Sequence, residues 1–259
     1  MRYLERSLRA CGLALIVLIG CTGGGVEDGT TNGTIIGGPS DQVTCSESSP
    51  CTVWLLGDSN TLAMGSIFAS IDMNHPEYDT VNLGIGGASS TVGLAYVESL
   101  LETEEAPEIA VVTYAGGDLL ESYPAAPQGA TAPTRSEVDQ IYANLEAICE
   151  LLQSEGTYCV LGKSIGALTE LHPLDAGLPE GTIDFAELTY IDNGYVLVGE
   201  VIEERYQPGW VSFRVPKDFD LWGHGDFFGY VHLTQAGYSI TSDRLEAKLD
   251  DLIITVDPS

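Results

Sequence analysis

Short apolar runs alternate with stretches of helical periodicity over most of the chain. The runs predict five strands, at Val53–Leu56, Thr80–Leu83, Ile109–Tyr114, Tyr158–Gly162 and Trp210–Phe213. Apolar residues at helical spacing predict helices at Thr61–Met73, Thr91–Glu102, Arg135–Ser154, Ile191–Tyr206 and Thr234–Leu252. Apolar strands that alternate with helices form parallel sheets with both faces covered. The pattern therefore predicts an α/β fold, a three-layer α/β/α sandwich around a five-stranded parallel sheet.

Functional sites of such folds lie outside the carboxyl ends of the strands. Four segments come directly after predicted strands: Ser59, the Gly84–Ser90 turn, the Ala115–Asp118 turn and the Asp220–His232 loop. We therefore expect them to meet at one edge of the sheet. Two long loops, Gly116–Thr134 and Ser164–Ala186, are expected to shape the mouth of a pocket there.

The N-terminus has the pattern of an export signal. Arginines precede the apolar stretch Leu13–Leu18, and Leu18-Ile19-Gly20-Cys21 resembles a bacterial lipobox. We predict a lipoprotein signal peptide at residues 1–20, lipidation of Cys21, and a Gly- and Thr-rich flexible tether at residues 21–44. With Thr22 next, the resemblance to bacterial lipoproteins implies a place in the cell envelope of a bacterium, at the outer membrane or cell surface. An ordinary signal peptide or an uncleaved anchor are the alternatives.

The chain has six cysteines, of which one leaves with the signal peptide and Cys21 carries the lipid. The other four form two close pairs, and in an exported chain these predict the disulfides Cys45–Cys51 and Cys149–Cys159. Buried free thiols are the alternative for the second pair. No cysteine or histidine motif has metal-ligand spacing, so neither a metal nor a cofactor is predicted.

The charge balance restricts the partners. The chain has 38 acidic and 10 basic residues and a formal net charge of −28. Such a surface repels nucleic acid and anionic headgroups, so we expect no nucleic-acid partner and contact with a membrane only through the lipid anchor. The plainer interpretation is a solvated acidic coat that keeps an exported protein soluble.

Two segments at opposite ends of the chain suggest nucleophilic catalysis. The predicted strand before Gly57-Asp58-Ser59-Asn60 would bring the Ser59 hydroxyl to the carboxyl edge of the sheet. His232, just before the last helix, could act there as its base. An ordinary turn around Ser59 and a helix-capping role for His232 are the alternatives. His224, between two glycines, could line the pocket.

From Val53 to Leu252 the chain resembles the GDSL or SGNH hydrolase superfamily in four blocks. The resemblance implies an SGNH/flavodoxin-like domain, here residues 45–259. It makes Ser59 the nucleophile and His232 the general base. It also implies that the backbone N–H groups of Ser59 and Gly87 form the oxyanion hole. A phosphate-binding loop is the alternative for the glycines around Gly87.

The chain departs from the family pattern at two positions. Gly117 stands where the family has the asparagine of the oxyanion hole, and Gly229 stands where it has the aspartate that orients the histidine. We expect Asn60 to supply a replacement amide. Asp226 is favoured over Asp220 to orient His232, and a backbone carbonyl is a further alternative.

These features predict an extracytoplasmic serine esterase that hydrolyses small acyl esters through a Ser-His acyl-enzyme mechanism. The expected substrates are an acetylated saccharide, a short-chain ester or a lysolipid. Because two family residues are replaced by glycine, the alternative is a catalytically degenerate surface lipoprotein that binds acylated glycans without hydrolysing them.

Overall fold

The computed structural model describes residues 43–65, 74–206 and 209–255. The predicted signal peptide, Cys21 and the tether up to residue 42 lie outside these residues. Five parallel strands form the central sheet, in the order β3 (Tyr78–Asn82), β2 (Cys51–Gly57), β4 (Ile109–Thr113), β5 (Tyr158–Lys163) and β6 (Trp210–Ser212). Each observed strand overlaps its predicted run, so the five-stranded parallel sheet is confirmed.

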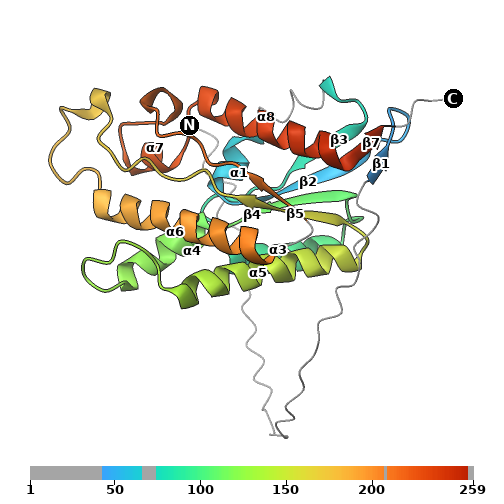
Figure 1. Ribbon diagram of the computed structural model, residues 1–259, viewed down its shortest axis with the longest axis horizontal. Helices are drawn as coiled ribbons and strands as arrows, with labels where there is room; N and C mark the ends of the chain where they lie inside the picture. The colour runs from blue at the N-terminus through green and yellow to red at the C-terminus, as the bar shows by residue number, and fades with distance from the viewer. Residues whose placement is uncertain (1–42, 66–73, 207–208, 256–259) are drawn as a thin grey trace, which may run out of the picture. The chain divides into compact units, whose positions relative to one another are not determined.

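Helices cover both faces of this sheet, which confirms the three-layer sandwich (Figure 1). One face carries α3 (Ser90–Leu101), α4 (Gly116–Ser122), α5 (Arg135–Ser154) and α6 (Phe185–Arg205). The opposite face carries α1 (Ser59–Ala63) and α8 (Gln235–Leu252). The middle strands β2 and β4 are almost wholly buried between the two layers because nearly all of their residues are apolar.

The helix predicted at Thr61–Met73 differs from α1, which begins at Ser59 and ends at Ala63. Two further predicted segments also differ from the structure. Helix α6 begins at Phe185, six residues before its predicted start, because the Asp184 carboxylate accepts hydrogen bonds from the N–H groups of Ala186 and Glu187. The predicted loop 116–134 begins with helix α4, whose Leu119 is fully buried. That single apolar anchor was too short a pattern to show a helix.

Short elements occupy the remaining connections at the carboxyl edge. They are the turns η1 (Tyr123–Ala125), η2 (Pro173–Asp175) and η3 (Phe219–Leu221) and the helix α7 (Phe227–Val231). None of the helices in the described part of the chain is long and apolar enough to cross a membrane.

A second, two-stranded parallel sheet joins the two ends of the described chain. Strand β1 (Val43–Cys45) pairs with β7 (Ile253–Thr255). The sequence did not reveal this pair because each strand is only three residues long and its partner lies at the other end of the chain. Residues 43 and 44, assigned to the tether, thus belong to β1.

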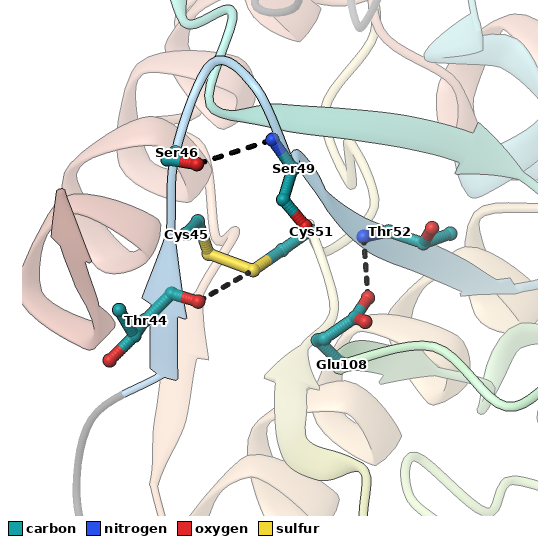
Figure 2. Close-up of a disulfide and its surroundings, with 7 residues drawn as sticks. All are labelled: Thr44, Cys45, Ser46, Ser49, Cys51, Thr52 and Glu108. Carbon is teal, nitrogen blue, oxygen red and sulfur yellow. Dashed lines mark hydrogen bonds between the residues drawn. A yellow bond between two sulfur atoms is a disulfide. The ribbon is translucent and has the colours of Figure 1, made fainter. Parts of the chain in front are cut away.

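Both predicted disulfides are present. Cys45–Cys51 links β1 to the start of β2, next to the hydrogen bond from Thr52 N–H to the Glu108 carboxylate (Figure 2). Cys149–Cys159 links α5 to β5, which excludes free thiols at this pair.

Candidate active site

Ser59 lies two residues after the end of the buried strand β2 and is the first residue of α1. Its neighbour Asp58 caps that helix: one carboxylate oxygen accepts the Asn60 N–H at 3.0 Å and the other accepts the Gly116 N–H at 3.0 Å. The strand order reverses between β2 and β4, and the ends of these two strands are where ligands bind in open α/β sheets. Asp58 thus joins the loops that follow both strands.

Asp58 is 3% exposed, and burial raises its pKa to about 6, although hydrogen bonds from the backbone of Asn60 and Gly116 act in the opposite direction. An unfolded aspartate releases its proton near its ordinary pKa of 3.8. Between these two pH values the folded state binds more protons than the unfolded state. The free energy of unfolding therefore falls as the pH rises through this window.

We expect Asp58 to remove about 3 kcal/mol of stability between about pH 4 and about pH 7. The measurement is denaturant unfolding of the wild type and Asp58→Asn across this range. The asparagine does not titrate, so the wild type should lose stability relative to the variant as the pH rises. A difference that stays constant with pH would contradict the buried, proton-binding carboxylate.

His232 reaches Ser59 from the opposite end of the chain. Its Nε2 lies 2.8 Å from the Ser59 Oγ, a hydrogen-bond distance, although 173 residues separate them in sequence. His232 lies between α7 and α8 and is half-buried. The Phe228 ring stacks on the imidazole with a centroid distance of 6.3 Å and is 62% exposed. The predicted pair is therefore brought together at the surface.

Burial lowers the pKa of His232, and the Asp226 charge and a hydrogen bond to the backbone of Phe228 only partly oppose this. The imidazole is consequently neutral at neutral pH. Nε2 faces the Ser59 hydroxyl, so in the tautomer protonated at the other ring nitrogen it can accept the hydroxyl proton of Ser59.

Asp226 does not orient His232 in the way predicted. Its carboxylate caps α7 and accepts the Gly229 N–H at 3.0 Å, and no hydrogen bond or ion pair joins it to His232 in the described residues. The short helix explains the difference, because its first turn needs an N-cap acceptor. Asp226 influences the ring only through its charge, and the backbone of Phe228 is the alternative partner that the sequence left open.

The second block forms a turn between β3 and α3. Asn82 donates to the Thr61 carbonyl at 2.7 Å and accepts the Gly84 N–H at 2.9 Å, which holds the turn against α1. Gly87 has a φ of +72°, a conformation that favours glycine, and no atom lies within 4 Å of where its Cβ would be. Among backbone hydrogen bonds between described residues outside helices and strands, none uses the N–H of Gly87 or Ser59. Both donors remain available to an oxyanion.

At both positions that depart from the family pattern, the glycine packs directly against the backbone of another segment. A Cβ on Gly117 would lie 2.4 Å from the carbonyl carbon and oxygen of Ala88. A Cβ on Gly229 would lie 2.6 Å from the His224 nitrogen. Neither position has room for a side chain, so the asparagine and the aspartate of the family are excluded by packing. Next to Gly117, the Asp118 carboxylate accepts hydrogen bonds from the N–H and the hydroxyl of Ser90, both at 2.7 Å.

The contacts of Asn60 differ from its predicted role as an amide donor to the oxyanion. Its side chain is buried, and its carbonyl oxygen accepts the hydroxyl proton of Tyr238 in α8 at 3.1 Å. No hydrogen bond joins its amide to Ser59 or His232 in the described part of the chain. Asn60 thus packs α1 against α8, and the replacement oxyanion donor stays a prediction without a supporting contact.

Within the described residues, one group has ligand atoms close enough to hold a metal ion: His172, Asp175 and His224, within 4.8 Å of one another. The two imidazole rings stack with 22° between their planes. A histidine coordinates a metal through a lone pair in its ring plane, so nearly parallel rings do not direct their lone pairs to one point. His172 Nδ1 also accepts the Leu174 N–H at 3.1 Å. The group fits a hydrogen-bonded cluster better than a metal site.

Comparison with known proteins gives matches in structure but not in sequence. No family sequence model and no curated protein sequence matches the chain. A GDSL-like lipase from Bacteroides thetaiotaomicron is similar with a TM-score of 0.51 and 16% identity, over 77% of this chain and 87% of that one. The psychrotrophic esterase EstA from Pseudoalteromonas sp. has a TM-score of 0.51 and 16% identity, over 77% and 96% of the two chains.

An acetyl xylan esterase, AlAXEase, has a TM-score of 0.51 and 17% identity, over 76% of this chain and 99% of that one. At such identities the likeness is one of fold. The resemblance of the four blocks and the observed sheet agree with it. The chain has the fold of the GDSL/SGNH hydrolase superfamily.

Proposed function

We propose that the protein is a serine esterase of the SGNH type. The observation that carries the proposal is the 2.8 Å contact between Ser59 Oγ and His232 Nε2 at the carboxyl edge of the sheet. A serine hydroxyl hydrogen-bonded to a neutral imidazole is the arrangement that activates a nucleophile for acyl transfer. Free backbone donors at Ser59 and Gly87 complete the set of groups that such a reaction needs.

In the proposed mechanism, His232 takes the hydroxyl proton as Ser59 attacks the ester carbonyl. The N–H groups of Ser59 and Gly87 stabilise the negative oxygen of the tetrahedral intermediate. The protonated imidazole then gives its proton to the departing alcohol, which leaves an acyl group on Ser59. Water, deprotonated by the same imidazole, attacks the acyl-enzyme and releases the acid.

The proposed substrates are small acyl esters: an acetylated saccharide, a short-chain ester or a lysolipid. Structural relatives with the same fold include an acetyl xylan esterase and a GDSL-like lipase, which supports both a saccharide and a lipid alcohol. The proposed location is the bacterial cell envelope, with the domain tethered through a lipid on Cys21. The lipobox-like sequence and the two disulfides support an exported protein.

Covalent labelling by a fluorophosphonate probe tests the function. One relative, the esterase EstA, was solved inhibited by monoethylphosphonate, a reagent of related chemistry. We expect one adduct per chain, located on the peptide that contains Ser59, and hydrolysis of p-nitrophenyl acetate. The rival function, a binder of acylated glycans, is favoured by the closed packing at Gly117 and Gly229. Binding of an acetylated oligosaccharide with no labelling and no hydrolysis would support that rival.

The pH dependence of hydrolysis should report the base. Because burial lowers the pKa of His232, kcat/KM should rise with pH along a limb whose midpoint lies below about 6.5, the ordinary value for histidine. The measurement is initial rates from about pH 4 to about pH 8 with an ester whose own hydrolysis is slow. A midpoint above about 7 would show that the imidazole is stabilised in its charged form and would contradict the desolvated base.

A further inference from the structure

The segment that leads into His232 is held by a residue from another loop. Asp175 ends the turn η2 in the connection between β5 and α6 and is 4% exposed. One of its carboxylate oxygens accepts the Gly225 N–H at 2.9 Å and the Tyr230 hydroxyl proton at 2.9 Å. The other lies 3.3 Å from His224 Nδ1. All three partners of this one carboxylate belong to the eight residues before His232.

Tyr230 is the centre of this attachment. It is 0% exposed, and it lies two residues before His232 on α7. Its hydroxyl also accepts the His172 N–H at 3.0 Å, and its backbone carbonyl accepts the Leu168 N–H at 2.8 Å. The end of α7 is thus fastened to the connection 164–184 through both its side chain and its backbone.

Asp175 is well suited to be a permanent acceptor in this place. Burial alone would raise its pKa, but hydrogen bonds from Gly225, Tyr230 and His224 outweigh burial and hold the pKa below its usual value. The carboxylate is therefore ionised at neutral pH, with every donor directed at it. A group of this kind fixes the geometry of the backbone that surrounds it.

We propose that Asp175 is the positioning residue for His232, in place of the carboxylate that the family has on the histidine ring. No carboxylate contacts His232 in the described residues. The position of the imidazole ring therefore depends on the backbone segment that leads into His232, residues 224–231. Asp175 supplies that position by tying Gly225 and Tyr230 to the neighbouring loop. This inference rests on the proposed esterase function, because it assigns how the base of that reaction is placed.

Two substitutions at Asp175 separate position from charge. Asp175→Ala removes every acceptor, so His232 should move relative to Ser59, and a misplacement of about 1 Å can cost about 100-fold in rate. Asp175→Asn keeps an acceptor oxygen for Tyr230 and Gly225, and its amide can donate to His224 Nδ1. We expect kcat to fall about 100-fold in the alanine variant and less than about tenfold in the asparagine variant, with KM within about threefold of the wild type in both.

The matched control is Glu137→Gln, which removes another hydrogen-bonded carboxylate, from the capping box of α5, with no bond to the segment 224–232. It should leave kcat unchanged. Two results would overturn the proposal: a wild-type kcat in Asp175→Ala, or an equal loss in the alanine and asparagine variants. If Asp175→Ala fails to fold, Tyr230→Phe removes the hydroxyl that donates to Asp175 and accepts the His172 N–H, at nearly constant shape. A wild-type kcat in that variant would likewise overturn the proposal.

Hydrogen exchange separates failure of this inference from failure of the proposed function. Asp175→Ala should raise the exchange rate of the amides of residues 225–232 by at least about tenfold and leave those of α5 unchanged. A wild-type protein that shows neither hydrolysis nor labelling would contradict the esterase function. The exchange experiment would still test whether Asp175 anchors residues 225–232. Unchanged exchange in residues 225–232 would refute Asp175 as their anchor.

Discussion

Replacing Ser59 with alanine is expected to lower kcat for ester hydrolysis by about 10⁶-fold, to a residual rate that the oxyanion donors and substrate binding keep about 10³- to 10⁴-fold above the uncatalysed reaction. The loss is large because the hydroxyl is the atom that forms the acyl-enzyme, and no neighbouring group replaces it. Ser59 is half-buried and its Oγ bonds only His232 among the described residues, so the fold should survive the change. The measurement combines steady-state rates with fluorophosphonate labelling.

Ser239→Ala is the control for this experiment. The Ser239 hydroxyl is exposed on α8 and donates to the Gln235 carbonyl at 3.0 Å, so its removal should leave both the rate and the labelling as in the wild type. Persistent labelling of the Ser59→Ala protein would move the nucleophile to another residue and end the assignment made from the Ser59–His232 contact.

Restoring the family asparagine at position 117 should damage the protein rather than improve it. The new side chain would start 2.4 Å from the Ala88 carbonyl and 2.5 Å from the Ser89 nitrogen, and backbone cannot give way as a flexible side chain can. We expect Gly117→Asn to reduce the free energy of unfolding by about 4 kcal/mol, which is at the upper end for overpacking. Denaturant unfolding measures the loss.

The same change should also lower kcat, because the displaced backbone adjoins the oxyanion donor Gly87. Gly177→Asn is the matched control: no atom lies within 4 Å of its Cβ position, and its backbone is not in the left-handed region. It should change stability and rate little. A Gly117→Asn protein with wild-type stability and higher activity would show that the turn after β3 can withdraw and that the oxyanion hole was incomplete.

The largest features of the fold could be predicted from the chain pattern. Strands such as Ile109–Thr113 are continuous apolar runs, and α5 carries both an apolar face and the capping box of Thr134 and Glu137, so local rules determine them. The pair β1 and β7 could not be predicted, since a three-residue strand has no periodicity. Helix α4 was missed for a similar reason, because one buried leucine does not make a pattern.

The site shows the same division. Short contiguous motifs contain the predicted site residues Ser59, Gly87 and His232, so each could be found locally in the sequence. The strand pattern already indicated that they would share one edge of the sheet. The orientation of His232 was another matter: Asp226 was chosen by closeness in sequence, whereas its carboxylate is used to cap α7. Nothing in the sequence around Asp175 pointed to the base, because its partners lie about fifty residues away.

By itself, the sequence determined the α/β class, the sheet, the disulfide pairs and the segments that hold Ser59 and His232, because each follows from periodicity, cysteine pairing or a short motif. Only the tertiary structure decided that Ser59 and His232 are in contact. Only the tertiary structure showed that Gly117 and Gly229 pack closely against the backbone of other segments. It also showed that the buried carboxylate of Asp175, on another loop, accepts hydrogen bonds from the segment before His232. These depend on distances between residues far apart in the chain, which local patterns do not encode.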